Sequence, residues 1–259
     1  MPNSPLHVHP TAVEGYGQGA RTYARGRPGF PPEALEWLRQ DLRLAPGKLA
    51  LEIGAGTGKF TKLLTQTGAD VVAVEPVTAM LAQLAVEQPQ VRTLRAAAQD
   101  LPIASAAVDA VICAQAFHWF ASQESLAEIR RVLKPGGALG LIWNVRDQSV
   151  GWVAELTRIM APYEGDAPRY DQGEWRAVFP AEGFGTLHER SFAHAHVGPP
   201  GQVIVERVAS VSFIAALDEA ARIRVLDEVR ALIAATPELA GRAQVTAPYV
   251  TRAYWCRRT

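Results

Sequence analysis

The sequence has few cysteines, no excess charge of either sign and no long apolar run. Its two cysteines, Cys113 and Cys256, lie far apart in apolar surroundings, so we expect buried reduced thiols rather than a disulfide or a metal site. The 26 basic and 26 acidic residues balance, which removes the bulk electrostatic argument for a nucleic-acid partner. No run approaches the roughly 18–20 apolar residues of a membrane helix, and no signal peptide is recognisable. These absences favour a cytoplasmic protein without a membrane partner.

Metal binding also has little support in the sequence. His194 and His196 have the H-x-H spacing of a ligand pair, on a predicted strand that also carries His188. A protein metal site normally needs a third or fourth ligand, and none is evident. We therefore expect no metal.

What the sequence does contain is a regular alternation of apolar strands and helices. Hydrophobic residues make up 48% of the chain and charged residues 20%, which is typical of a globular protein with a large core. Strands that alternate with helices and are apolar nearly throughout predict a parallel sheet covered on both faces. The predicted strands lie at 49–53, 70–74, 91–96, 108–114 and 138–144.

The two ends of the chain are less regular. Residues 1–30 are polar and glycine-rich. Such a segment is typical of an adaptable arm that can fold as a lid onto a bound ligand, and a solvated tail is the alternative interpretation. Residues 31–259 are interpreted as one domain with helical insertions. The insertions are expected at about 149–180 and 200–240, the second helical over 202–235, and further strands at 184–197 and 245–256.

A glycine-rich turn follows the first predicted strand, in the stretch LALEIGAGTGKF. Gly54, Gly56 and Gly58 recur at alternate positions before a predicted helix over 58–67. Glycine suits such a turn because it adopts unusual φ angles and lets a ligand approach the backbone closely. The spacing G-x-G-x-G differs from the G-x-G-x-x-G of dinucleotide binders. On its own, the pattern is also compatible with an ordinary strand-to-helix loop.

An acidic residue, Glu75, ends the second predicted strand and lies 17 positions after Gly58. Nucleoside-binding α/β proteins place a carboxylate there to accept hydrogen bonds from ribose hydroxyls. The turn and Glu75 together therefore indicate a ligand that contains a nucleoside, and a plain surface glutamate becomes the weaker interpretation.

Five motifs follow one another in order over about residues 48–145: LEIGAGTG, VVAVEP, AAAQDLP, AQAFHWF and RVLKPGGALGLI. This set resembles the signature of class I S-adenosylmethionine-dependent methyltransferases of the small-molecule, type 11-like kind. The flanking stretches YARGRPGFP and PYVTRAYW resemble the trans-aconitate methyltransferase-like group. The resemblance implies an α/β, Rossmann-like sheet of seven mostly parallel strands, with helices on both faces, an antiparallel last strand and a helical insertion in the C-terminal half.

The resemblance also implies S-adenosylmethionine as cofactor, S-adenosylhomocysteine as product, and a set of cofactor contacts. In chain order these contacts serve the methionine moiety, the ribose, the adenine and again the methionine end. The family often has an aspartate at the position of Ala97 and an acidic residue at the position of Gln99. Gln99 still offers a hydrogen-bond acceptor through its side-chain oxygen, whereas Ala97 does not replace the aspartate's contact with the adenine. The implied residues are Glu52, Gly54, Ala55, Gly56, Glu75, Pro76, Met80, Ala98, Gln99, Ala114 and Gln115.

The acceptor side rests on residue chemistry and position. An activated methyl donor needs the acceptor atom held in line and water excluded. A carboxylate acceptor then needs a cation to hold it, whereas a phenol, hydroxyl or amine calls for a general base. His118 is the candidate base, with a structural histidine as the alternative, and Arg25, Arg27 and Arg146 are candidate cations. Further candidate substrate contacts are Tyr16, Tyr23, Trp119 and Trp143.

The sequence therefore predicts methyl transfer to a small molecule, on an oxygen of a carboxylate, by a monomer or homodimer. Two other classes stay open. A nucleotide-dependent oxidoreductase shares the glycine turn and Glu75, although the glycine spacing and the KPGG turn at 134–137 argue against it. A non-catalytic cofactor-binding or regulatory module would share every cofactor motif.

Overall fold

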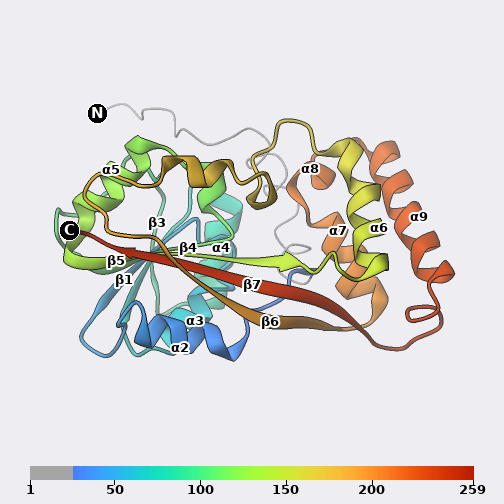
Figure 1. Ribbon diagram of the computed structural model, residues 1–259, viewed down its shortest axis with the longest axis horizontal. Helices are drawn as coiled ribbons and strands as arrows, with labels where there is room; N and C mark the ends of the chain where they lie inside the picture. The colour runs from blue at the N-terminus through green and yellow to red at the C-terminus, as the bar shows by residue number, and fades with distance from the viewer. Residues whose placement is uncertain (1–25) are drawn as a thin grey trace.

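The computed structural model describes residues 26–259. Its centre is a seven-stranded sheet in the order β3-β2-β1-β4-β5-β7-β6 (Figure 1). The neighbours from β3 to β5 pair in parallel, and β7 is antiparallel to both β5 and β6. This confirms the predicted Rossmann-like sheet with an antiparallel last strand. The strands are β1 (Leu49–Ile53), β2 (Asp70–Val74), β3 (Arg92–Leu94), β4 (Val108–Ala114), β5 (Leu133–Arg146), β6 (His188–Gly198) and β7 (Val245–Arg257).

Helices precede β1 and lie in most of the connections between the strands. The α-helices of five or more residues are α2 (Pro32–Gln40), α3 (Thr61–Thr65), α4 (Thr78–Glu87), α5 (Gln123–Val132), α6 (Gly151–Met160) and α9 (Glu219–Ala235). The other helical pieces are the 3₁₀ helices η1 (Phe117–Trp119), η2 (Ala161–Tyr163), η3 (Tyr170–Gln172) and η4 (Glu174–Val178), the π-helix η5 (Gly201–Glu206), and the short α-helices α7 (Arg207–Ala209) and α8 (Ser212–Ala215).

Both faces of the sheet are covered because alternate strand residues point to opposite sides. In β1, Leu51 belongs to the cluster packed against Ile129 of α5, whereas its neighbour Ala50 belongs to the cluster that contains Trp37 of α2 and Leu84 of α4. Burial on two sides explains why the central strands are apolar nearly throughout.

A third hydrophobic cluster lies beside the sheet, where α6, η5, α7, α8 and α9 pack on one another (Figure 1). We refer to these five helices as the helical cap. Met160 of α6, Val208 of α7 and Val225 of α9 are all fully buried there. The cap therefore has a core of its own and can present side chains toward the sheet edge.

Two boundaries near the glycine turn and the KPGG turn differ from the sequence prediction. The helix expected over 58–67 is confined to Thr61–Thr65, because positive φ angles at Gly56 and Gly58 delay its start. The residues expected to form a turn at 134–137 lie within β5, which pairs with β4 from Leu133 and shifts register before Ala138.

Other differences lie toward the ends of elements and in the second half. The helix expected over 202–235 is divided into η5, α7, α8 and α9. The strand expected from residue 184 starts at His188, and that expected over 91–96 is reduced to Arg92–Leu94. The strands at 70–74 and 108–114 have the predicted bounds.

Three general expectations can be compared with residues 26–259. None of the helices there combines the length and apolarity of a bilayer-spanning segment. Cys113 and Cys256 are buried free thiols. No group of three histidine, cysteine or acidic side chains in this part of the chain is arranged to hold a metal.

Candidate cofactor and acceptor site

The glycine turn after β1 is tied to the end of β2. The backbone N–H groups of Gly54 and Ala55 both donate to the carbonyl of Val74, at 2.9 and 3.1 Å. Gly54 and Gly56 have φ angles of +71° and +58°, which other residues rarely adopt. A Cβ on Gly54 would also lie 2.6 Å from the Cβ of Ala116. Glycine is therefore required here for both conformation and space.

Glu75 forms a second tie between the same two segments. One carboxylate oxygen accepts the N–H of Gly56 and the other accepts the N–H of Val77, each at 2.9 Å. Burial raises the pKa of Glu75, and the two backbone hydrogen bonds oppose that shift. Each oxygen retains a further lone pair, so the side chain can still accept hydrogen bonds from a ligand.

The turn also brings together buried groups with shifted protonation. Burial raises the pKa of Glu52 to about 8, although its hydrogen bond from the Thr61 hydroxyl at 2.6 Å lowers it. Burial, together with the charges of Arg27 and Arg207, lowers the pKa of Lys59 to about 8. Burial therefore favours the neutral form of both side chains.

The predicted adenine contacts lie beyond Glu75. A Cβ added to Gly56 would be in ordinary contact with the sulfur of Met80, at 3.7 Å, so the turn and α4 face each other. Ala98 is buried, as are its neighbour Ala97 and Met80. The Oε1 atom of Gln99 is buried and has no hydrogen-bond partner within the described chain. An unpartnered buried acceptor is costly, and a ligand amino group would satisfy it.

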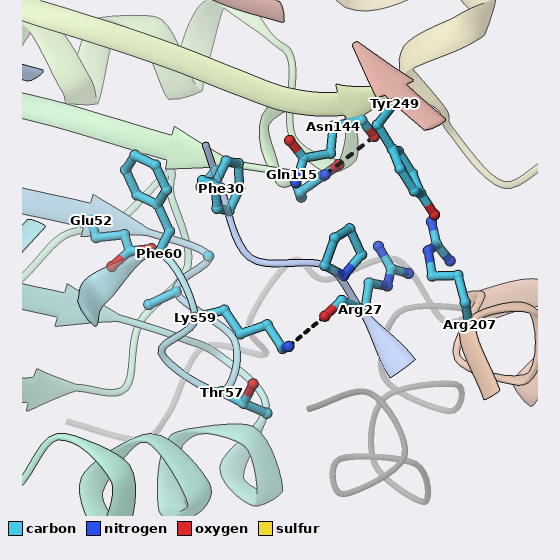
Figure 2. A pocket seen from close by; sticks show the side chains of 14 residues that line it. Arg27, Phe30, Glu52, Thr57, Lys59, Phe60, Gln115, Asn144, Arg207 and Tyr249 are labelled. Carbon is cyan, nitrogen blue, oxygen red and sulfur yellow. Dashed lines mark hydrogen bonds between the residues drawn. The ribbon is translucent and has the colours of Figure 1, made fainter. Parts of the chain in front are cut away.

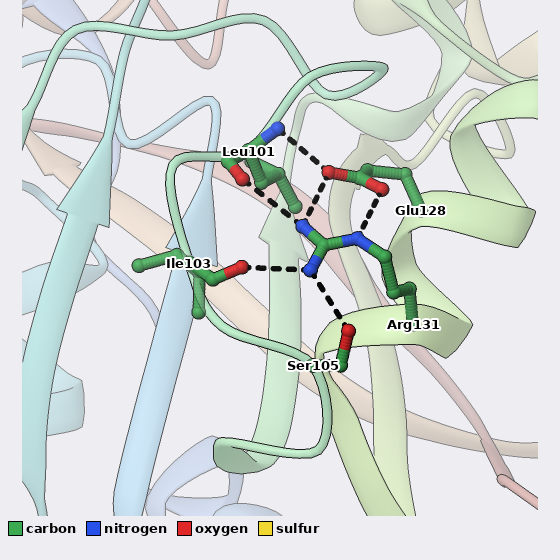
Figure 3. Close-up of polar contacts among 5 residues, drawn as sticks. All are labelled: Leu101, Ile103, Ser105, Glu128 and Arg131. Carbon is green, nitrogen blue, oxygen red and sulfur yellow. Dashed lines mark hydrogen bonds and ion pairs between the residues drawn. The ribbon is translucent and has the colours of Figure 1, made fainter.

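A clasp on α5 holds the segment that follows these residues (Figure 3). The Arg131 guanidinium pairs with both oxygens of Glu128 and donates to the carbonyls of Leu101 and Ile103, at 3.0 and 2.8 Å, and to the hydroxyl of Ser105. Glu128 in turn accepts the backbone N–H of Leu101 at 2.8 Å. The clasp fixes the backbone directly after Gln99.

Two adjoining cavities open at this edge of the sheet. The turn cavity is lined by Glu52, Gly54, Ala55, Thr57, Phe60 and Ala114, among others (Figure 2). The histidine cavity is lined by His118, Trp119, Trp143, Arg146, Tyr170 and Phe213, among others, and encloses about 700 Å³ including its open mouth. The two cavities share Arg27, Gln115, Asn144 and Arg207.

Gln115 occupies the junction with a strained backbone. Its φ angle is +58°, a left-handed conformation that residues other than glycine seldom adopt. The strain is held by its N–H, which donates to the carbonyl of Ile142 at 2.8 Å. Gln115 thus stays between the two cavities, directly after β4.

The described end of the N-terminal arm lies over the glycine turn. Lys59 donates to the carbonyl of Arg27, Asn144 donates to the carbonyl of Gly29 at 2.7 Å, and Phe30 meets Phe60 edge-on. The Arg27 guanidinium donates to the carbonyl of Ser210 in the helical cap, at 3.1 Å. Residues 26–30 therefore connect the glycine turn, β5 and the cap. Tyr16, Tyr23 and Arg25 lie outside the described residues.

Arg207 is a site residue that the sequence analysis missed. It lines both cavities, is 8% exposed, and its Nε and Nη1 atoms have no hydrogen-bond partner in the described chain. Burial first, and then the charge of Arg27, lower its pKa to about 10, although the Tyr249 hydroxyl opposes this. Figure 2 shows Arg207 reaching toward Tyr249 from the cap. A charged residue within the apolar run VIVERVASVSFIAAL was the available signal.

His118 lines the histidine cavity, but it is poorly suited to the base role expected for it. Its Nδ1 accepts a hydrogen bond from the Trp143 indole at 3.1 Å, so that lone pair is occupied. Burial, and then the charge of Arg27, lower the pKa of His118 to about 3. A group so weakly basic takes up a proton poorly at neutral pH.

The structure sorts the predicted residues into three places. Arg27 and Gln115 lie where the cavities meet. Met80 faces Gly56, Pro76 follows Glu75, and Ala98 belongs to the hydrophobic cluster of Val74. These three residues and Gln99 line neither of the two cavities. The turn cavity receives Glu52, Gly54, Ala55 and Ala114, and the histidine cavity receives His118, Trp119, Trp143 and Arg146.

The sheet order, the glycine turn and the buried Glu75 define an α/β protein built to bind a ligand that contains a nucleoside. Comparison with known proteins is consistent with this class. Residues 51–141 match the family model of a methyltransferase domain. An uncharacterized methyltransferase of Mycobacterium tuberculosis is 40% identical over 236 residues, 91% of this chain and 92% of that protein.

Solved structures show the same fold. A putative type II methyltransferase of Anaeromyxobacter dehalogenans has a TM-score of 0.62 at 23% identity and covers 89% of this chain and 96% of its own. A Haemonchus contortus phosphoethanolamine N-methyltransferase, solved with S-adenosylhomocysteine, has a TM-score of 0.56 at 15% identity and covers 93% of this chain and 57% of its own. The chain belongs to the methyltransferase family and is an S-adenosylmethionine-dependent enzyme.

The α5 clasp leads to a first prediction. Replacing Glu128 with Gln removes the charge partner of Arg131 and weakens the hold on Leu101. Charged hydrogen bonds contribute about 1.5–3 kcal/mol each, so we expect faster amide exchange over residues 97–105 and lower affinity for S-adenosylhomocysteine. Hydrogen–deuterium exchange and calorimetry measure the two effects. The control is Glu155→Gln, which breaks an exposed Glu–Arg pair of the same i,i+3 spacing on α6. Equal effects in both variants would contradict the clasp.

Proposed function

We propose that this methyltransferase transfers a methyl group to an oxygen of a carboxylate on a small molecule. The observation that carries the proposal is Arg207, a buried guanidinium whose Nε and Nη1 have no partner in the described chain, at the junction of the two cavities. A buried unpaired charge is costly. A planar carboxylate would satisfy both its charge and its fork of donors.

The other charges around the histidine cavity support an anionic acceptor. Arg27, Arg146, Arg169 and Arg207 line it, against the single carboxylate of Asp171 among the described lining residues. Arg169 is already paired with Glu164. Burial lowers the pKa of Arg146 as it does that of Arg207. Bound anionic groups would offset this concentration of buried positive charge.

The cofactor contacts form part of the same proposal. Glu75 would accept hydrogen bonds from the ribose hydroxyls, and Gln99 would accept one from the adenine amino group. The unpartnered Oε1 of Gln99 and the space beside Gly56, bounded by Met80, support this fit. The methionine moiety would lie in the turn cavity beside Glu52, where Gly54, Ala55, Ala114 and Gln115, which also line that cavity, would help to hold it.

Bound S-adenosylmethionine supplies a methyl group that is already activated by its sulfonium. The protein's task is therefore to hold the acceptor and exclude water. A carboxylate is ionised at neutral pH, so no residue has to remove a proton from it. Arg207 and Arg146 would orient it, and Trp119 and Trp143 would form apolar walls of the site.

An acceptor that needs deprotonation is less compatible with these residues. His118, the candidate base, has its Nδ1 engaged by Trp143 and a pKa lowered to about 3. The lid role of residues 1–30, a cytoplasmic location and a monomeric or homodimeric state are further proposals that rest on the sequence.

Methyl transfer itself is the test of the proposed function. We expect the purified enzyme, given S-adenosylmethionine and a panel of small carboxylic acids, phenols and amines, to form methyl esters of one or more acids. Mass spectrometry of the products identifies the methylated atom. Methylation confined to phenols or amines would overturn the carboxylate proposal. Cofactor binding without transfer to any of the three classes would favour the non-catalytic module.

The role of Glu75 leads to a separate prediction. Glu75→Ala should weaken binding of S-adenosylhomocysteine by about 10- to 100-fold, because one or two charged hydrogen bonds to the ribose are lost. Isothermal titration measures the change, with the melting temperature recorded to exclude unfolding. Glu87→Ala, at an exposed glutamate of α4, is the matched control. Unchanged affinity in Glu75→Ala would refute the ribose role.

Arg207 provides a test of acceptor binding. Arg207→Met keeps most of the length of the side chain and removes its charge, so the KM for the acceptor should rise about 10-fold or more. The affinity for S-adenosylhomocysteine should change less than about 3-fold, which is the size of an indirect effect of a substitution that removes no contact with the cofactor. Arg224→Met, at an exposed arginine of α9, is the control. A loss confined to S-adenosylhomocysteine affinity would assign Arg207 to the cofactor instead.

A further inference from the structure

The hydrogen bond between Trp143 and His118 fixes more than the position of the imidazole. The indole Nε1–H can only donate, so the His118 Nδ1 that it contacts at 3.1 Å must offer a lone pair. A neutral imidazole with an unprotonated Nδ1 carries its proton on Nε2. Among residues 26–259 the one side-chain hydrogen bond of His118 is this bond at Nδ1, and the ring lines the histidine cavity.

The surroundings of His118 favour the neutral ring. Arg27, Arg146, Arg169 and Arg207 line the same cavity, and Asp171 is the one carboxylate among its described lining residues. Nearby positive charges disfavour a second proton on the imidazole. His118 is therefore set as a neutral group with one donor and one engaged acceptor.

Trp143 itself is held rigidly, which makes it suited to fix a tautomer. It lies in β5, is 1% exposed, and packs against Trp175, Tyr170 and Tyr254 with ring centroids 4.7, 5.0 and 5.9 Å away. An indole enclosed in this way cannot turn its N–H elsewhere without repacking its neighbours. The direction of the Nε1–H is thus determined by the fold.

We propose that Trp143 is a positioning residue that holds His118 as a neutral Nε2–H donor, and that this N–H donates a hydrogen bond to the acceptor's oxygen. The second half of the proposal rests on the proposed carboxylate chemistry. A carboxylate has two oxygens, so one can accept from His118 while the other receives the methyl group. No proton is transferred. The same N–H would disfavour a protonated amine, which offers only donors.

The first half can be tested without cofactor or substrate. Two-bond ¹H–¹⁵N correlation spectra of the imidazole should show Nε2 protonated and Nδ1 unprotonated between pH 5 and 8. In Trp143→Phe, loss of the donor should let the tautomers mix and raise the pKa of His118, because the hydrogen bond favours the neutral form. Trp119→Phe removes the other neighbouring indole and should leave the tautomer unchanged. A proton on Nδ1, or an imidazolium near pH 7, in the unaltered protein would overturn the proposal.

The second half is tested by substitutions at His118 in the active enzyme. His118→Gln retains an amide N–H near the Nε2 position and should keep kcat/KM within about 10-fold, whereas His118→Leu should lose more. General-base catalysis typically contributes 10²–10⁴-fold, so an equally large loss in both variants, with an acidic limb in the wild-type pH profile, would overturn the donor role. If the wild type methylates no carboxylate, the proposed function fails, while the NMR result still decides the tautomer.

Discussion

The glycine turn, at the edge of the sheet where the methyl donor is proposed to bind, depends on one buried carboxylate. Glu75 accepts the N–H groups of Gly56 and Val77, while the carbonyl before it, that of Val74, accepts those of Gly54 and Ala55. These bonds hold an irregular turn against the end of β2, beyond the last pair of the ladder. A buried carboxylate needs such partners to be tolerated. The same turn geometry that would bind a nucleoside thus also supplies the hydrogen bonds that offset the desolvation cost of the buried Glu75 carboxylate.

The protonation states around the cavities form one pattern. Burial is the largest cause in each case: it raises the pKa of Glu52 to about 8 and lowers those of Lys59, Arg207 and His118 to about 8, 10 and 3. Desolvation of ionisable groups on this scale marks places where folding accepts a cost. Arg207 is one of these places, because its buried Nε and Nη1 atoms lack hydrogen bonds that a ligand anion can supply.

The glycine turn and the strands around it could be predicted from the sequence, because the residues that determine their structure are close together in the chain. The strands at 70–74 and 108–114 are short apolar runs bounded by turn residues, and the glycines and Glu75 lie next to strands in the chain. The acceptor side depends on tertiary contacts. The hydrogen bond between Trp143 and His118 joins residues that are 25 positions apart in the sequence. Arg207 follows a π-helix, and hydrophobic periodicity in a sequence does not predict a helix of that kind. The contact with Trp143 and the lowered pKa that make His118 a poor base could not be predicted from the sequence for this reason.

This division has a consequence for what family membership implies. The methyltransferase model matches residues 51–141, which include the glycine turn, Glu75, the α5 clasp and His118. Segment 26–30, Trp143, Arg207 and Tyr249 all lie outside that range, yet they line the cavities with it. Because an activated methyl group demands little beyond orientation from the protein, the groups outside the matched core can change without loss of the donor chemistry. On the proposed function, the four arginines that line the histidine cavity, Arg27, Arg146, Arg169 and Arg207, all lie outside the matched range, so relatives that keep the core can differ in the acceptor they bind.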